Sequence, residues 1–435
     1  MGYHQLFIEQ MVAISGRTVA LIAGRTVLSL LLIGIQLYVL RALVRIIQSW
    51  QLNPSRTRLL KTSVLVFVIV VNLPLVFFLI EGFFKPNGLL LYSPPQAFES
   101  SMRPFAYVFF VWTIGSLFFA AASPLAMACF AFFQFFLRKP SARESVATVQ
   151  ALDLSRRRFL RTALTAVSAM PFAVSAYGAV AARTRNVIEK VIIPIPGLPA
   201  QLEGFTIVQL SDIHAGMFMK ESAMAEYARI ANSLKPDLIA LTGDFVATHS
   251  DQVEPFMRAM SSLKAKYGVF GCLGNHDIFT RSEEALVRGF ANAGFKLLRN
   301  ENETIEIDSA MLNIIGVDYF LASRSTASTL DSVLNRISLG GTTILLQHAP
   351  QLFPQAAKFG IDLTLSGHTH GGQIALTIGE MIITPAALST MFLAGLFKID
   401  DSYLYVNRGL GTTGPPIRIN APPEITHITL KTSSR

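Results

Sequence analysis

Four long apolar stretches occupy much of the first 185 residues and limit what this part of the chain can fold into. They cover residues 18–40, 62–80, 104–137 and 162–182. A helix needs about 20 apolar residues to cross the hydrocarbon core of a bilayer, and each stretch is close to or above that length. Arg25 and Gln36 interrupt only the first. Charged residues make up 15% of the chain, against about 25% in soluble domains. We therefore predict an α-helical transmembrane region of about four spans over residues 1–185.

The positive charge of the chain belongs to this apolar half. Residues 1–185 hold 18 Lys and Arg against 5 Asp and Glu, whereas residues 186–435 hold 19 against 23. This distribution argues against nucleic-acid binding, which needs a basic surface on a folded domain. The cationic residues gather in 41–61 and 138–161, next to the spans. The positive-inside rule places both loops in the cytoplasm, so that four spans leave residues 186–435 on the extracytoplasmic side.

The sequence S-R-R-R-F-L-R at residues 155–161 precedes the fourth stretch. It resembles a twin-arginine export signal placed inside the chain. The same arginines also suit the cytoplasmic anchor of a membrane helix. Both interpretations place the downstream domain outside, and we favour an anchor that is not cleaved.

The pattern changes near residue 186, where short β-branched runs begin to alternate with amphipathic helical patterns. Predicted strands cover 205–210, 238–242, 269–273, 311–317, 343–347, 363–366, 382–384, 403–406 and 424–430. Predicted helices cover 221–234, 253–264, 282–293 and 326–337. This alternation favours a layered α/β domain over residues 186–435.

Polar residues with metal-ligand chemistry directly follow several of these strands. They are Asp212, His214, Asp244, Asn275, His276, Asp277, His348, His368 and His370. Side chains at the carboxyl ends of neighbouring strands converge in space although they are far apart in sequence. Imidazole, carboxylate and amide groups suit Zn, Fe or Mn. Each motif alone also fits a turn, a helix cap or a buried histidine, but five of the eight histidines fall in this ordered set.

The ordered motifs resemble the calcineurin-like metallophosphoesterase superfamily over about residues 190–435. The sequence is most similar to a branch, often bacterial and membrane-attached, in which the last motif continues as G-H-T-H-G-G-Q, as at 367–373 here. Segments 406–411, 416–418 and 422–425 also resemble that branch. The resemblance implies a four-layer αββα metallophosphatase sandwich with two divalent metal ions (Mn, Zn or Fe) between its sheets. It also implies attachment to a bacterial inner membrane.

The resemblance also implies roles for individual residues. One metal ion would be held by Asp212, His214, Asp244 and His370, and the second by Asp244, Asn275, His348 and His368. His276 would act as general acid or charge stabiliser, with Asp277 orienting its ring. Asn275, Arg408 and Arg418 would contact the substrate, although a salt bridge in the C-terminal strands also accounts for the two arginines.

The expected activity is hydrolysis of a phosphodiester or phosphomonoester by a hydroxide that bridges the two ions. The membrane region makes the lipid bilayer a partner and favours a cell-envelope or lipid-linked substrate; the sequence names no protein partner. The apolar segment 391–397 either lies against the bilayer or a lipid tail, or packs inside the domain. The alternative function is a metal-stabilised cell-envelope binding module without significant turnover. A transporter would need charged residues within the spans, and Arg25 is the only one in the four stretches.

Overall fold

The computed structural model of the chain describes residues 2–77, 96–136, 146–319, 331–334, 340–378 and 381–433. The chain divides into two compact units, the first formed by Met1–Tyr92 and Pro104–Tyr177, the second by Ser93–Arg103 and Gly178–Arg435. The second unit thus begins a few residues before the boundary predicted at 185 and also takes in a short helical segment. Two contacts explain this: the backbone N–H of Arg418 donates to the carbonyl of Gly178, and Gln252 donates to the carboxylate of Glu99.

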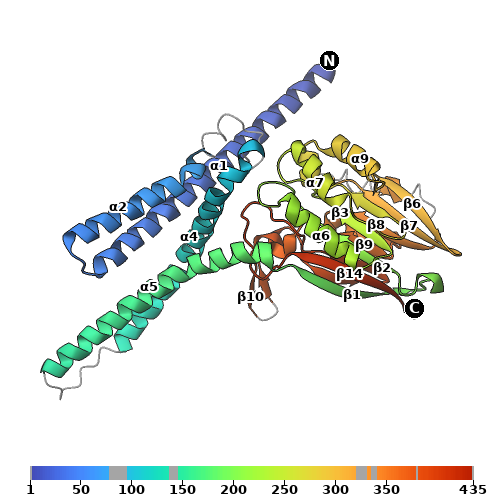
Figure 1. The fold of residues 1–435 in the computed structure, drawn as a ribbon. Helices are drawn as coiled ribbons and strands as arrows, with labels where there is room; N and C mark the ends of the chain where they lie inside the picture. Colours follow the sequence, from blue (N-terminus) through green and yellow to red (C-terminus); the bar gives the residue numbers. More distant parts are fainter. Residues whose placement is uncertain are drawn as a thin grey trace. The chain divides into compact units, whose positions relative to one another are not determined.

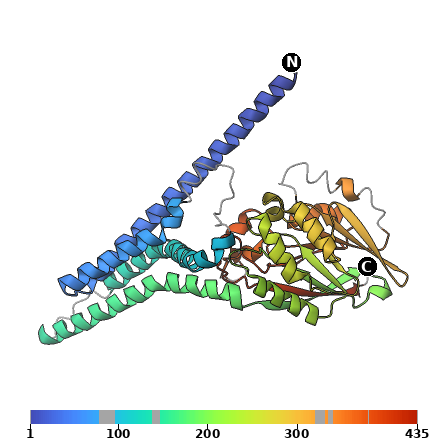
Figure 2. The ribbon, with the colours of Figure 1, turned by 45° about the horizontal axis from the view of Figure 1, so that its top comes forward.

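The long helices are α1 (Gly2–Ser49), α2 (Pro54–Val71), α4 (Gln96–Phe136) and α5 (Val146–Thr184). Figures 1 and 2 show α1 as one continuous helix. Four segments are long and apolar enough to cross a membrane, namely Thr26–Ser49, Pro54–Phe77, Ser101–Ala128 and Thr165–Thr184. The four predicted spans are confirmed as apolar helices. Within the described residues the first apolar segment begins at Thr26, and the side chain of Arg25 lies outside those residues. Residues 78–80 and 137 of the predicted spans lie outside the described residues.

Gln36, a polar residue within the first span, forms a hydrogen bond inside the first unit. Gln36 is buried, and its side-chain oxygen accepts a hydrogen bond of 2.5 Å from the indole N–H of Trp112. The Trp112 ring stacks on Phe172 with ring centroids 5.0 Å apart, and Val68 belongs to the same apolar cluster. Residues from α1, α2, α4 and α5 thus share one core. An amide that bonds across helices is a common solution where lipid offers no partner.

Two six-stranded sheets form the centre of the second unit. The first has the order β1 (Val187–Pro196), β14 (Glu424–Ser433), β2 (Thr206–Leu210), β3 (Leu238–Thr242), β4 (Val269–Cys272), β5 (Lys296–Leu297). The second has the order β12 (Gly395–Ile399), β13 (Ser402–Val406), β9 (Leu363–Ser366), β8 (Thr342–Gln347), β7 (Ala310–Val317), β6 (Glu301–Ile307). The run β2–β5 is parallel, and so is the run β13–β9–β8–β7.

The two sheets face each other across a mainly apolar core. Ile207, Leu238 and Phe270 of the first sheet lie in one cluster with Ile314 and Leu346 of the second. On the outer face of the first sheet pack α6 (Glu221–Ser233), α7 (Val253–Met260) and α9 (Glu283–Asn292), and on that of the second packs α11 (Phe353–Lys358) (Figure 1). The predicted αββα sandwich is confirmed.

The sequence located the central strands better than the edges. Strands β3 and β9 match the predicted ranges, whereas β1, β6 and β12 were not predicted. All three lie at or near sheet edges, where one face meets solvent and the apolar run is broken. Pro194 and Pro196 in β1 further hide its pattern, since proline is tolerated on edge strands. Most of the helix predicted at 326–337 lies outside the described residues.

Candidate metal centre

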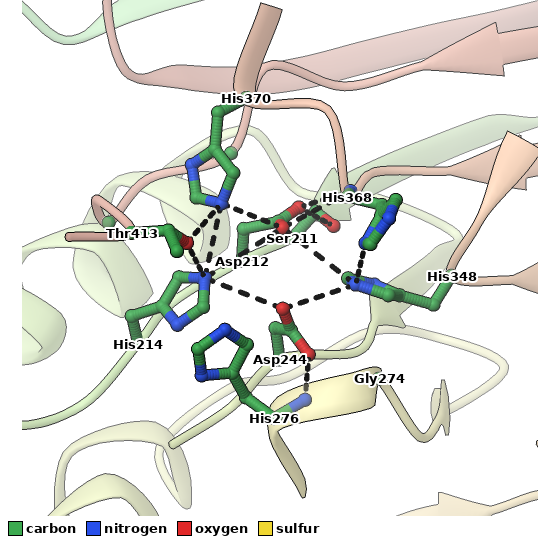
Figure 3. Close-up of polar contacts among 12 residues, drawn as sticks. Ser211, Asp212, His214, Asp244, Gly274, His276, His348, His368, His370 and Thr413 are labelled. Carbon is green, nitrogen blue, oxygen red and sulfur yellow. Dashed lines mark hydrogen bonds and ion pairs between the residues drawn. The ribbon is translucent and has the colours of Figure 1, made fainter. Parts of the chain in front are cut away.

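Each candidate ligand follows the carboxyl end of a parallel strand. Asp212 and His214 follow β2, Asp244 follows β3, and Asn275, His276 and Asp277 follow β4 in the short helix α8 (Asn275–Phe279). His348 follows β8, and His368 and His370 follow β9. Because the strands of both sheets end at the same edge, the structure brings all of these residues together. Figure 3 shows the side chains of Asp212, His214, Asp244, His348, His368 and His370 turned toward a common centre.

The donor atoms form two groups that meet at Asp244. On one side, Nε2 of His214 lies 3.1 Å from Nε2 of His370, which lies 3.3 Å from Oδ1 of Asp212. On the other side, Nδ1 of His368 lies 3.3 Å from Nε2 of His348. Between the two groups, Oδ2 of Asp244 lies 3.5 Å from Nε2 of His214 and 3.2 Å from Nε2 of His348.

These separations suit ligands around a metal ion. With metal–ligand bonds of about 2.0–2.2 Å, neighbouring ligand atoms lie about 3.0–3.5 Å apart in octahedral and tetrahedral sites. A second observation agrees: the side-chain oxygen of Asn275 is buried without a hydrogen-bond partner in the part of the chain that the structure describes. A buried acceptor of this kind costs free energy unless something binds it. The residues around Asp244 therefore fit divalent metal binding.

The backbone around the centre is held in conformations that most residues avoid. Asp212, His214, Asp244, His368 and His370 all have positive φ, between 49° and 71°. Such angles cost free energy and persist only where the surrounding fold imposes them, typically at functional sites. Gly274 lets the loops approach, since a Cβ at that position would lie 2.1 Å from Oδ1 of Asp244.

Three of the imidazoles are neutral at pH 7. Burial, together with the neighbouring His276, lowers the pKa of His214 to about 3. Burial and the charge on His348 lower the pKa of His368 to about 4. Burial and the neighbouring His214 hold the pKa of His370 well below its usual value. A neutral imidazole offers the lone pair that metal binding requires.

The fourth imidazole, His348, is charged. Burial lowers its pKa, but the carboxylates of Asp244 and Asp212 outweigh burial and raise the pKa to about 10. Burial likewise opposes ionisation of Asp244, yet His348 holds the pKa of this carboxyl well below its usual range. Burial raises the pKa of Asp212 to about 6. Both carboxylates are thus mainly anionic at pH 7, which gives the centre its affinity for cations.

Comparison with known proteins agrees with this geometry. The sequence profile of the calcineurin-like phosphoesterase family matches residues 205–372. The uncharacterized metallophosphoesterase YkuE of Bacillus subtilis (strain 168) is 32% identical over 290 residues, which cover 65% of this chain and 99% of YkuE. The chain belongs to the calcineurin-like phosphoesterase family.

Two other similar proteins are named as transmembrane proteins. A transmembrane protein with metallophosphoesterase domain from Danio rerio is 30% identical over 305 residues, covering 68% of this chain and 66% of that protein. The protein of the same name from Bos taurus is 29% identical, with 65% of each chain covered. The matched part thus spans about two thirds of these two relatives. Family membership, the donor set and the four apolar helices support a metal-dependent phosphoesterase that is a membrane protein.

Within this calcineurin-like site, His276 and Asp277 have separate tasks. Nδ1 of His276 lies 2.6 Å from the carbonyl oxygen of Ala247, so a proton on Nδ1 is donated to that carbonyl and Nε2 remains for chemistry. The sequence interpretation assigned this orienting role to Asp277. The structure corrects it: the Asp277 carboxylate accepts backbone N–H groups, two on each oxygen, from Asp244, Phe245, Val246 and Gly274. Asp277 therefore joins the loops after β3 and β4.

The two arginines proposed as substrate contacts are occupied by protein groups. Arg418 is 1% exposed, and its guanidinium donates to the carbonyls of Arg408, Gly409, Gly411 and Ala421. It also contacts the His370 ring, with 3.2 Å between Nη2 and Nδ1. Arg408 forms ion pairs with Glu189 and Glu424. Arg418 is therefore a positioning residue for His370 and the 408–411 loop. Arg408 forms a salt bridge, which was the second of the two roles that the sequence allowed for it.

Sequence reasoning missed three residues beside the centre. The Thr413 hydroxyl contacts the rings of His214 and His370, and Gln373 hydrogen-bonds to the backbone of Thr413. The Tyr319 ring lies 5.7 Å from His368 and 6.2 Å from His348, between centroids. Burial and the nearby Asp244 raise the pKa of Tyr319. Only Gln373 was within a motif that the sequence singled out, and its role depends on a contact 40 residues away.

Proposed function

We propose that the chain is a phosphoesterase that uses two divalent cations to hydrolyse a lipid-linked or other cell-envelope phosphoester. The observation that carries this proposal is the geometry of Asp244. Its Oδ1 accepts the backbone N–H of His276 at 2.8 Å, which fixes the carboxylate, while Oδ2 points between His214 and His348. An oxygen held between two imidazole groups suits a ligand that bridges two ions. Two such ions lower the pKa of a shared water and neutralise charge on a phosphoryl group.

The remaining chemistry belongs to residues of the chain. His276 has a ring nitrogen within 4.8 Å of ligand atoms of His214 and Asp244, so that its free nitrogen would lie beside a phosphoryl group bound at the centre. With Nδ1 donating to Ala247, the imidazolium form carries its second proton on Nε2 and can give it to the leaving oxygen. Protonation of the leaving group makes bond breaking easier in both diesters and monoesters.

The location is part of the proposal. Lys and Arg in residues 41–61 and 138–161 favour a cytoplasmic position for both segments. The second unit would then act on the extracytoplasmic face of a bacterial inner membrane, where phosphoesters are carried mainly by lipids and envelope polymers. Labelling of an introduced surface cysteine, Asp401→Cys, in intact and in permeabilised cells tests the side. Labelling only after permeabilisation would contradict the proposed location without affecting the proposed chemistry.

The decisive experiment measures hydrolysis of bis(p-nitrophenyl) phosphate and p-nitrophenyl phosphate by the full chain in detergent. The protein is stripped with chelator and reloaded with Mn, Zn or Fe. We expect metal-dependent turnover that falls in His276→Ala, and by more on an alkyl phosphoester than on these esters, because p-nitrophenolate leaves readily without a proton. Asp244→Asn should lose both turnover and the second equivalent of bound metal, counted by elemental analysis. Turnover that persists after metal removal would reject the proposal. A folded protein that binds two ions without turning over either ester would indicate the binding module.

A further inference from the structure

An apolar surface protrudes from the second unit beside the metal centre. Strands β10 (Leu376–Ile378) and β11 (Met381–Ile383) form a separate two-stranded sheet, and the chain then continues to Met391. Leu388 is 93% exposed and Met391 is 81% exposed. The apolar hairpin surface consists of Leu376, Met381, Ile382, Ile383, Leu388 and Met391, all classed among the exposed large apolar residues.

The exposure pattern is unusual for a strand. A strand on a core buries every second side chain, whereas all three residues of β11 are exposed. Scattered apolar residues need no explanation, but six exposed ones gathered between residues 376 and 391, with Leu376 paired directly opposite Ile383, favour contact with another apolar phase. The segment that follows behaves differently, since Phe392 and Phe397 pack against Phe353. Of the two interpretations of residues 391–397, internal packing holds for the two phenylalanines, whereas Met391 (81%) and Leu396 (40%) are exposed.

Two hydrogen bonds attach this surface to the metal-ligand loop. The Thr384 hydroxyl donates to the carbonyl of Gly372 at 2.8 Å, directly after β11. The hydroxyl of Thr369, which lies between His368 and His370, donates to the carbonyl of Leu393. Whatever contacts the apolar hairpin surface is therefore held close to the metal centre.

The end of the last apolar helix packs within the second unit. Gly178 lies inside the apolar segment Thr165–Thr184, and its carbonyl accepts the backbone N–H of Arg418 at 3.0 Å. The packing is close, since a Cβ on Gly178 would lie 2.7 Å from Ile417. Ile419, one residue beyond Arg418, forms a β-bridge with Ile374. The backbone N–H of Ala375, directly before β10, donates to the carbonyl of Ile419. The side of the second unit that carries β10 thus contacts the last turns of a membrane helix.

We propose that the apolar hairpin surface enters the bilayer interface and brings the metal centre to a phosphoester whose apolar tail remains in the membrane. This inference rests on the proposed function for the reaction, but the contact itself does not depend on it. The occupant is the bilayer, because the apolar segment Thr165–Thr184 ends within the second unit, against Ile417 and Arg418. A second copy of the chain is the competing occupant, and the test below distinguishes it.

The first measurement is the depth of a spin label on the full chain in nanodiscs of phosphatidylethanolamine and phosphatidylglycerol. Leu388→Cys carries the label, and Val287→Cys on α9, also exposed, is the matched control; Cys129→Ser removes one native thiol and Cys272 is buried. We expect the label at 388 to be accessible to oxygen and protected from a polar nickel reagent, and the label at 287 to show the reverse. Equal nickel accessibility, or spin–spin broadening between two copies, would overturn the proposal.

The second measurement compares two diesters that differ only in their tail, ethyl and hexadecyl p-nitrophenyl phosphate. Leu388→Ser with Met391→Ser should reduce kcat/KM for the hexadecyl ester by about tenfold and leave the ethyl ester unchanged. The control Val287→Ser with Met311→Ser should change neither. An equal loss on both esters would overturn the link between this surface and the substrate. If the unaltered chain hydrolyses neither ester, the proposed function fails, while the label depth still decides the membrane contact.

Discussion

The hydroxyl oxygen of Thr413 lies 3.0 Å from Nε2 of His214. The same oxygen lies 2.9 Å from Nε2 of His370, so it stands among the donors on the Asp212 side of the centre (Figure 3). Gln373 fixes its place: the amide oxygen accepts the backbone N–H of Thr413, and the amide nitrogen donates to the carbonyls of Thr413 and Pro415. The loop after β13 therefore contributes a hydroxyl to a site whose other members follow five different strands.

Replacement of this hydroxyl should weaken metal binding without unfolding the protein. Thr413→Val keeps the shape of the side chain and removes the oxygen that contacts the two imidazoles. We expect a loss of roughly tenfold in affinity for one of the two ions, the size seen when groups that support metal ligands are removed. Competition with a chelating dye measures it. Thr413→Ser should retain most of the affinity and Thr412→Val should not change it. Tight binding of both ions by Thr413→Val would show that the hydroxyl has no part in the centre.

Asp277 should prove to be a stabilising residue. In Asp277→Asn, an amide NH₂ replaces one carboxylate oxygen. The two backbone N–H groups that donate hydrogen bonds to that oxygen then lose their acceptor. Because the site is fully buried, we expect a loss of about 3 kcal/mol in stability and a fall of roughly 10 °C in the unfolding temperature.

Reaction of the buried Cys272 thiol with a maleimide dye during heating reports this unfolding, in a Cys129→Ser background. Asp401→Asn, at an exposed turn, is the control and should unfold at the temperature of the unaltered chain. An Asp277→Asn protein of normal stability but with a shifted pH profile of turnover would instead support the orienting role expected from the sequence.

The sequence predicted most strand ends and the polar residues that follow them because both depend on local patterns. Buried parallel strands such as β3 are continuous apolar runs, and a polar residue directly after such a run is visible without knowledge of the fold. The parts that could not be predicted depend on long-range contacts. Thr413 reaches the centre because Gln373 holds its loop, and Ala247 replaces Asp277 as the partner of His276 because the β3 loop folds over α8. Neither pairing leaves a periodic signal in the sequence.

Metal binding should release one proton at neutral pH. The pKa of His348 is raised to about 10, so this imidazole is protonated at pH 7, whereas a ligand must be neutral. The pKa values of His214 and His368 lie at about 3 and 4, so neither has a proton to lose. We expect the affinity for the ion on the His348 side to rise about tenfold per pH unit between pH 7 and 9.

Calorimetry of the chelator-treated protein in two buffers of different ionisation enthalpy gives the number of protons released. His348→Gln should abolish the release as well as weaken binding. The ion pair also stabilises the fold: its contribution is fully present below the unfolded pKa of about 6.5 and is lost as the pH rises through about 10. Binding that releases no proton at pH 7 would contradict a charged His348.

Arg418 distinguishes a positioning role from a substrate contact. Its guanidinium donates to five backbone carbonyls, that of His370 included, and is fully buried, and burial lowers its pKa to about 10. Arg418→Lys supplies a single ammonium that cannot reach the same carbonyls, so we expect a loss of about 3 kcal/mol in stability and weaker metal binding through the displaced His370. Arg408→Lys, in a partly exposed ion pair with Glu424, should cost much less. The dye assay on Cys272 and the metal competition assay measure both effects. If Arg418→Lys unfolds normally, binds both ions and raises only KM, the guanidinium contacts the substrate after all, as the sequence first indicated.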